Sequence, residues 1–174
     1  MKKQKPLPFS HPLDMGLVHS VTHVRLVPDE ATRKAIARDY GLHAVDAFEA
    51  LLEVNPLANG VFRITGDVKA KVQPLCVVTL DPFDQVIDEA VAADFAPDDV
   101  IARLTKRAEE NEVEDFEPPD PILDGGIDLG QVACEFLALA LDPYPKKPGA
   151  VFEGLGAEEP SLSPFAALKG LKGE

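Results

Sequence analysis

The segment IDLGQVACEFLALALDPYP, residues 127–145, decides the fold expected for this chain. Asp128 can cap the N-terminus of a helix, and Gln131 three residues later completes a capping-box pattern. Residues 132–141 are apolar except for Glu135, and Pro143 ends the helix because proline lacks the amide that a helix interior needs. A helix that is apolar on most sides must be surrounded by protein. The segment therefore predicts a core helix over 128–142.

The chain before this helix is expected to supply the strands that cover it. Residues 62–72 alternate strictly, which predicts a strand, and residues 19–27 and 83–95 alternate less cleanly. The period of residues 42–54 fits either a helix or a strand. An isolated strand is unstable, so the Asn59-Gly60 turn favours a hairpin with a strand at 42–54. The apolar face of the strand at 62–72 consists of Phe62, Ile64, Gly66, Val68, Ala70 and Val72.

These strands predict an antiparallel meander with one apolar face and one wet face. The helix at 128–142 would cover the apolar face, so the fold class expected is α+β, with helices packed on one face of the sheet. A further helix is predicted over 29–40, with Asp29 as its N-cap, Glu30 and Lys34 as an i,i+4 pair, and Gly41 just after its end.

The predicted domain organisation has three parts. Residues 1–18 contain several prolines and are expected to form an extended arm, and residues 19–148 form a single α+β domain. Within it, residues 96–126 predict an acidic, partly mobile loop with only a helical turn or two over 98–108. Residues 149–174 predict a flexible tail that carries a short amphipathic motif, SPFAALKGLK, at 163–172.

The composition points to a soluble cytoplasmic protein that does not depend on covalent crosslinks. The chain has 174 residues and two cysteines, Cys76 and Cys134, which are expected to be reduced thiols. It shows neither a signal peptide nor a membrane-spanning run. The net charge of −13 disfavours direct binding to a phosphate backbone and suits a basic protein partner.

No motif in the sequence argues for catalysis or for a cofactor. The chain lacks a glycine-rich phosphate loop, a GxSxG motif and an HExxH motif. His19 and His23 lie on one side of a predicted strand but form a weak metal pattern. Cys76 lies near a turn and is a candidate reactive thiol, although no histidine or lysine close to it in sequence would lower its pKa. We therefore expect a protein without enzymatic activity, metal or cofactor.

Three segments together resemble the YceD family, also described as large ribosomal RNA subunit accumulation proteins. They are residues 66–83 (GDVKAKVQPLCVVTLDPF), residues 125–149 (GGIDLGQVACEFLALALDPYPKKPG) and residues 163–172 (SPFAALKGLK). The positions that match the family pattern include Cys76, Pro82, Phe83, Asp128 and Glu135. Many members carry a second cysteine at the turn, where this chain has Thr79, and a late cysteine that is absent from 144–152 here.

The resemblance implies a role in accumulating large-subunit (23S) rRNA, hence in ribosome biogenesis, without catalytic residues. The leading hypothesis is a non-enzymatic factor that binds a basic ribosomal protein or a large-subunit assembly intermediate. Its apolar anchor would be the tail residues Pro164, Phe165, Leu168 and Leu171. One alternative is direct rRNA binding by a local basic patch, and another is an enzyme whose site forms only in three dimensions. The candidate basic patch comprises Arg33, Lys34, Arg38, Arg63, Lys69 and Lys71.

Overall fold

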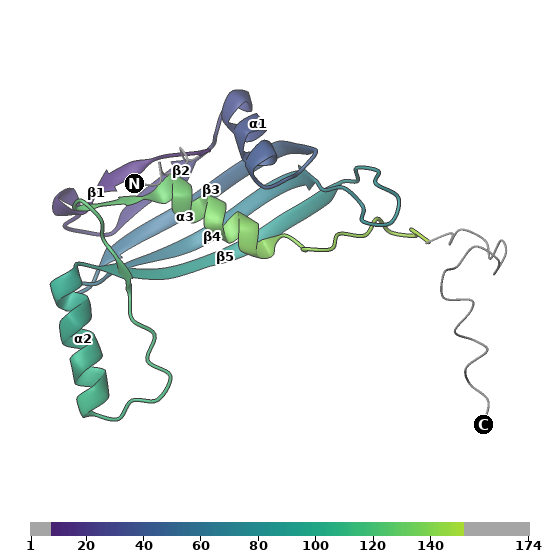
Figure 1. Cartoon of the computed structure of the whole chain (residues 1–174). Helices are drawn as coiled ribbons and strands as arrows, with labels where there is room; N and C mark the ends of the chain where they lie inside the picture. Colours follow the sequence, from purple (N-terminus) through teal and green to yellow (C-terminus); the bar gives the residue numbers. More distant parts are fainter. Residues whose placement is uncertain (1–7, 152–174) are drawn as a thin grey trace, which may run out of the picture.

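The computed structural model describes residues 8–151 of the chain (Figure 1). In chain order its elements are β1 (Pro12–Asp14), the 3₁₀ helix η1 (Met15–Leu17), β2 (Thr22–Leu26), α1 (Glu30–Asp39), β3 (Ala44–Pro56), β4 (Phe62–Gln73), β5 (Gln85–Ala96), α2 (Asp98–Glu110), β6 (Asp120–Pro121), β7 (Gly126–Asp128) and α3 (Leu129–Ala140).

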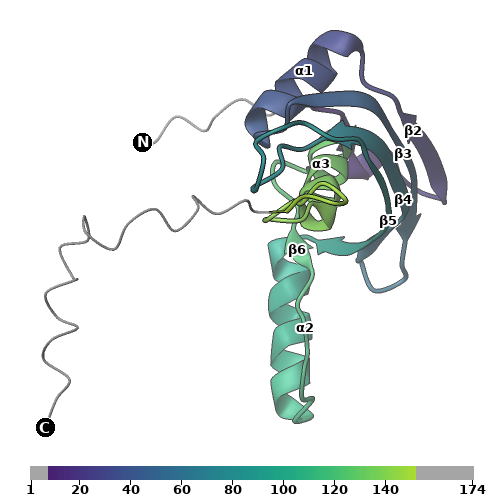
Figure 2. The ribbon, with the colours of Figure 1, turned by 90° about the vertical axis from the view of Figure 1, so that its right-hand side faces the viewer.

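The five-stranded sheet confirms the predicted meander and the α+β fold class. Its strand order is β2-β3-β4-β5-β6, and the first four strands pair antiparallel with their neighbours along the chain. The short strand β6 pairs parallel with the end of β5. A second sheet contains only β1 and β7. The sheet remains open on the side of β5 that faces away from β4 (Figure 2).

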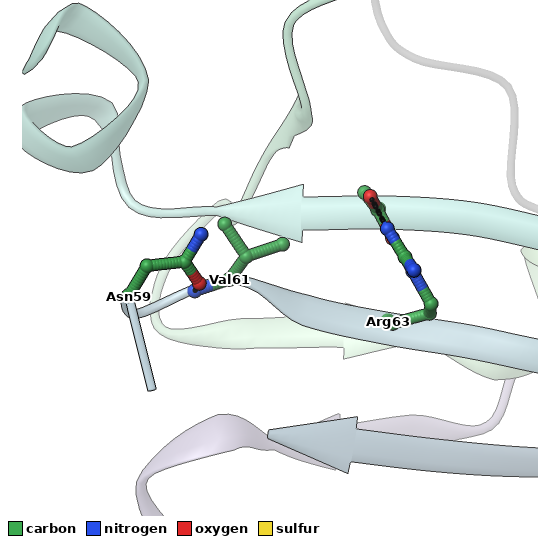
Figure 3. A network of polar contacts seen from close by, with 4 residues as sticks. Asn59, Val61 and Arg63 are labelled. Carbon is green, nitrogen blue, oxygen red and sulfur yellow. Dashed lines mark hydrogen bonds and ion pairs between the residues drawn. The ribbon is translucent and has the colours of Figure 1, made fainter. Parts of the chain in front are cut away.

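The hairpin of β3 and β4 confirms the strand predicted at 42–54, whose period was ambiguous, although the strand runs from Ala44 to Pro56. The turn between the two strands is closed by a hydrogen bond from the Leu57 N–H to the Val61 carbonyl at 2.8 Å. Asn59 accepts from the Val61 N–H at 3.2 Å (Figure 3), and Gly60 takes a φ of +85°, which favours glycine. The residues of the turn, and not the hydrophobic period, correctly predicted that this element is a strand.

Helix α3 lies in the concave side of the sheet, as Figures 1 and 2 show. The inward side chains of β4 and β5 include Val68 and Val91, which are buried and belong to one hydrophobic core with the helix. Leu129 and Leu137 on α3 have no exposed surface. The prediction of a core helix over this segment is confirmed, and its cap Asp128 accepts from the Gln131 N–H at 3.1 Å.

Two expectations for α3 were wrong. The helix is not surrounded by protein, because Glu135 is exposed and the Leu139 side chain keeps 77% of its surface exposed. The Gln131 side chain does not reach back to the cap; it donates to the Glu135 carboxylate at 2.7 Å, one turn further along. The sheet leaves one side of α3 uncovered, where Glu135 and Leu139 are exposed and Phe136 is half-buried.

Helix α1 forms as the sequence predicts. Asp29 caps it by accepting from the Thr32 N–H at 2.8 Å, and Lys34 pairs with Glu30 at 2.6 Å. Gly41 follows the helix with a φ of +67°. Ile36 and Ala37 are buried in the core that α3 shares, so α1 covers the same face of the sheet.

Helix α2 is longer than the one or two turns expected for residues 98–108, since it spans 13 residues. Asp98 and Asp99 occupy its first turn, where carboxylates stabilise the helix dipole, and Lys106 pairs with Glu110 at 3.8 Å. A small separate cluster of Val61, Ala96 and Val100 anchors its first turn. The rest of α2 projects away from the sheet (Figure 1). The first half of the segment predicted to be an acidic loop is therefore a regular helix.

The N-terminal segment 1–18, predicted to be an extended arm, is described from residue 8 onward. There β1 pairs with β7, Met15 and Val18 are buried, and the Phe9 ring packs edge-on against Phe48 with their centroids 6.1 Å apart. Residues 8–18 thus contribute to the core. Residues 1–7 and 152–174, which include the predicted C-terminal motif, lie outside the described part of the chain.

Candidate functional site

The open face of α3 borders a groove on the described surface, which we call the α3 groove. It consists of two adjoining hollows of about 600 and 500 Å³ that share Phe95, Asp120, Val132 and Glu135. One hollow extends along β5 and the end of α3, and the other extends toward β7. The remaining lining residues used below are Arg63, Asp94, Glu117, Leu123, Asp124, Asp128, Phe136 and Leu139.

The α3 groove carries a strongly acidic rim. Six carboxylates line it and only one cation, Arg63; the carboxylates are Asp94, Glu117, Asp120, Asp124, Asp128 and Glu135. Within residues 8–151, no Lys or Arg side chain forms an ion pair with Glu117, Asp120 or Asp124. These three exposed carboxylates leave a negative potential at the groove that a basic ligand would neutralise.

Arg63, the single cation that lines the groove, already forms an ion pair with Asp94. Figure 3 shows Arg63 extending from β4 toward the neighbouring strand β5. There its guanidinium donates two hydrogen bonds to the Asp94 carboxylate, at 2.8 and 2.7 Å. This bidentate pair lowers the pKa of Asp94 and raises that of Arg63. Arg63 therefore adds no free positive charge to the rim.

The floor of the groove is apolar. Val132 is buried, and Phe95 and Phe136 are half-buried. Leu139 and Leu123 keep 77% and 68% of their surface exposed, at opposite ends of the groove. An apolar floor inside a rim of carboxylates is the arrangement expected of a protein-binding surface, with a central anchor and a charged border.

Asp128 holds one end of the groove together. Burial acts to raise its pKa, but hydrogen bonds outweigh that effect, so the pKa lies below its ordinary value. The Ser10 hydroxyl donates at 2.5 Å and the His11 N–H at 2.7 Å, while the Gln131 N–H donates as the helix cap. One ionised side chain thus ties the N-terminal segment to the start of α3.

Cys76 lies in a second structural feature, the loop between β4 and β5, which we call the Cys76 loop (residues 74–84). The loop is closed on itself by hydrogen bonds from the Cys76 N–H to the Asp81 carbonyl at 2.9 Å and from the Phe83 N–H to the Pro74 carbonyl at 3.2 Å. The Val77 N–H donates to the Pro145 carbonyl at 2.9 Å, which attaches the loop to the segment after α3.

Cys76 has no exposed surface. The N–H of Lys147 donates to its sulfur and contributes most to lowering the pKa; burial opposes this effect, and donors from Thr79 and Val78 add to it. The pKa falls to about 7. No histidine or lysine side chain contributes to this lowering; the donors are the backbone N–H of the distant Lys147 and groups of the neighbouring Val78 and Thr79, which the sequence analysis did not consider. By contrast, burial raises the pKa of Cys134 to about 12.

The lowered pKa of Cys76 predicts a pH-dependent stability. The folded thiol loses its proton near pH 7, whereas the unfolded thiol keeps it until about pH 9. Between these values the unfolded state binds more protons, so the free energy of unfolding should rise with pH and lose this contribution below pH 7. Urea unfolding from pH 6 to 9 under reducing conditions should show this rise in the wild type relative to Cys76→Ser. Parallel profiles for the two proteins would contradict the assignment.

The candidate basic residues for RNA binding do not form one patch. Arg33, Lys34 and Arg38 lie on α1, which covers the inner face of the sheet, whereas Arg63, Lys69 and Lys71 point from the outer face of β4. In addition, Lys34, Arg63 and Lys69 pair with Glu30, Asp94 and Asp88 respectively. The arrangement divides and partly neutralises the positive charge that a phosphate backbone would need.

The positions that carry the sequence resemblance fall in two separate places. Asp128 and Glu135 line the α3 groove, whereas Cys76, Pro82 and Phe83 belong to the Cys76 loop. The tail residues Pro164, Phe165, Leu168 and Leu171 lie outside the described residues. Among residues 8–151, no three His, Cys, Asp or Glu side chains gather as metal ligands, and no helix is long and apolar enough to cross a membrane.

Comparison with known families finds one match. Residues 64–172, well over half of the chain, match the family model described as large ribosomal RNA subunit accumulation protein YceD. The chain belongs to the YceD family. The match includes the Cys76 loop, α3 and the C-terminal motif, and it excludes β1 to β3. No curated protein and no solved structure matches the chain.

Sequence reasoning singled out Asp128 and Glu135 but missed other residues that line the groove of this YceD family member. Glu117, Asp120 and Asp124 stood in a run interpreted as a solvated loop, and Leu139 was assigned to the core. The signal that could have found them is the helix itself, because residues apolar on nearly every side need a cover that the strands provide on one side only. The link to large-subunit rRNA follows from the family and not from any single residue.

Proposed function

We propose that this protein is a non-enzymatic ribosome biogenesis factor of the cytoplasm that supports accumulation of 23S rRNA by binding a basic ribosomal protein or a large-subunit assembly intermediate. The family supplies the connection to large-subunit rRNA. The observation that supports a protein partner is the α3 groove, in which an apolar floor is bordered by carboxylates. Its charge favours encounter with a basic protein, and its floor offers the apolar contacts that hold one.

Direct rRNA binding is the less favoured function. It would require the negatively charged protein to approach phosphates with basic side chains that lie on opposite faces of the sheet and are partly paired. An enzyme is less favoured as well. None of the residues described between 8 and 151 is both buried and polar or charged, and the hollows on the surface are open. The polar groups that line these open hollows therefore lack the water-excluded setting in which electrostatic catalysis is strongest.

The proposed function predicts that neutralising the rim of the α3 groove weakens binding. The test protein carries Glu117→Gln, Asp120→Asn and Asp124→Asn, and its matched control carries Glu109→Gln, Glu112→Gln and Glu114→Gln, which do not line the groove. Exposed ion pairs contribute roughly 0.2–1 kcal/mol each, so we expect about tenfold weaker retention of purified large-subunit ribosomal proteins for the groove variant alone. Retention should also fall with added salt.

The groove variant and the control variant should also differ in cells. A strain in which the groove variant replaces the wild type should accumulate less 23S rRNA relative to 16S rRNA, whereas the control variant should not. Equal behaviour of the two variants would remove the groove from the proposal. Retention of rRNA alone, without ribosomal protein, would favour direct RNA binding. A separate Phe165→Ala variant tests the C-terminal motif, and unchanged protein retention would exclude that motif as an anchor.

A further inference from the structure

The outer edge of β5 is unpaired over most of its length. On its other side β5 pairs with β4 from Gln85 to Phe95. On the outer side, β6 pairs only with Phe95 and Ala96, and no other described strand joins this edge. Figure 2 shows β6 below α3, beside the end of β5. A long strand with an open edge is a template for pairing with another chain.

The backbone groups that point outward along this edge can be assigned. The Ile122 N–H donates to the Ala96 carbonyl at 3.0 Å, so Ala96 directs its carbonyl to the outer edge. Backbone groups of alternate residues point to the same side of a strand, and the β4–β5 register has no bulge. Val86, Asp88, Ala90 and Ala92 therefore present their N–H and C=O groups outward.

The open edge lies beside the uncovered side of α3, where Leu139 is exposed and Phe136 is half-buried. Ala92, Ala93 and Asp94 line the same hollow as Phe136 and Leu139. An extended segment at this edge would gain backbone hydrogen bonds from β5 and apolar contacts from α3. The exposed Glu117 and Asp120, with Glu135 on α3, would surround it with negative charge. The hollow therefore fits an extended segment that alternates apolar and basic side chains.

This protein could itself supply two occupants for the edge, a second copy of the chain or its own C-terminal motif. Charge disfavours the first, and sequence period disfavours the second. A second copy would bring the same acidic edge, including Asp88 and Glu117, to an identical one, and like charges disfavour that pairing. In the C-terminal motif, Phe165, Leu168 and Leu171 recur every third residue, which suits a helix and not the two-residue period of a strand.

We infer that the edge of β5 beside α3 binds a basic, extended segment of a partner protein, which adds a strand to the sheet next to β6. The inference rests on the proposed function and names how its partner is held. The added strand lies along Val86–Asp94, with apolar side chains toward Phe136 and Leu139 and basic side chains among the carboxylates. A partner strand in this position would cover the side of α3 that the sheet leaves open.

Two synthetic peptides test this inference on the full-length protein. One is an octapeptide of alternating lysine and valine, and the other has four lysines followed by four valines. Their charge and composition are identical, so general electrostatic attraction cannot separate them. Because only the first places its apolar side chains on one face of a strand, we expect it to bind about tenfold more tightly by calorimetry.

The edge variant Ala90→Pro supplies the second arm. It removes an outward N–H without touching the ladder to β4, and Ala90→Val keeps the N–H as the matched control. Alternating-peptide affinity should fall about tenfold for Ala90→Pro alone. If the proline variant fails to fold, hydrogen exchange on the wild type decides, since the peptide should protect the amides of Asp88, Ala90 and Ala92.

Several results would overturn the inference while leaving the proposed function intact. These are equal affinity for the two peptides, equal affinity of the proline and valine variants, or protection that falls elsewhere than β5. Tighter peptide binding by Phe165→Ala would assign the edge to the C-terminal motif, and a dimer that Ala90→Pro dissociates would assign it to a second copy. The proposed function itself fails only if large-subunit ribosomal proteins are not retained.

Discussion

Replacing Leu137 by alanine is expected to lower the free energy of unfolding by about 2–5 kcal/mol, the range found for leucine truncation in a packed core. Leu137 has no exposed surface and belongs to the core that α3 forms with the inner face of the sheet. The cavity left behind cannot collapse easily, because helix and sheet are each held by their own hydrogen bonds. Against a typical stability of about 5–15 kcal/mol, this loss is large.

Leu139→Ala is the matched control, since it removes the same atoms from the same helix. Leu139 is 77% exposed, so its truncation should change stability by less than about 0.5 kcal/mol. It should, however, weaken binding of the alternating peptide. Urea unfolding followed by circular dichroism measures both variants. Equal destabilisation would show that the face of α3 assigned to the surface is in fact covered.

Replacing Gly66 by alanine is expected to be more damaging still. Gly66 pairs with Leu52 and Val91 in the middle of the sheet and has a φ of +150°. A Cβ at this position would lie 2.0 Å from the Leu51 carbonyl oxygen and 3.0 Å from the Leu52 Cα. Both are backbone atoms that cannot move without breaking the β3–β4 ladder. We expect a loss of more than about 4 kcal/mol, or no folded protein.

Gly125→Ala separates the clash from the strain of a positive φ. Gly125 has a φ of +76°, but nothing lies within 4 Å of where its Cβ would be. Only the conformational cost of about 1–2 kcal/mol applies there. The two variants are compared by soluble yield and by urea midpoint. A Gly66→Ala protein as stable as Gly125→Ala would mean that β3 and β4 do not approach as closely as the register requires.

The main elements of the fold were predictable because their signals are local. The alternation at 62–72 follows from the two-residue period of a strand, and the Asn59-Gly60 turn fixed the nature of residues 42–54. The caps at Asp29 and Asp128 each bond to an amide two or three residues away. The length of α2 was underestimated because the helix has few apolar residues, which pack in a small separate cluster, so its hydrophobic period is weak.

The candidate site was much less predictable, and the reason is distance along the chain. Glu117 and Glu135 line one groove only because β6 pairs with the end of β5 and brings segment 117–124 beside α3. The Cys76 thiol has a low pKa because the Lys147 N–H, far along the chain, donates to it. Neither arrangement leaves a pattern in a short window of residues.

The sequence by itself determined which segments of this protein are strands and helices, which of their faces are apolar, and that the chain resembles the YceD family. These properties depend on side-chain period, on turns and on caps, all of which act over a few residues. Only the tertiary structure decided that α3 is covered on one side, that the edge of β5 stays open and that the carboxylates gather between them. Those features depend on contacts between segments far apart in the chain, such as the pairing of β6 with only the last two residues of β5.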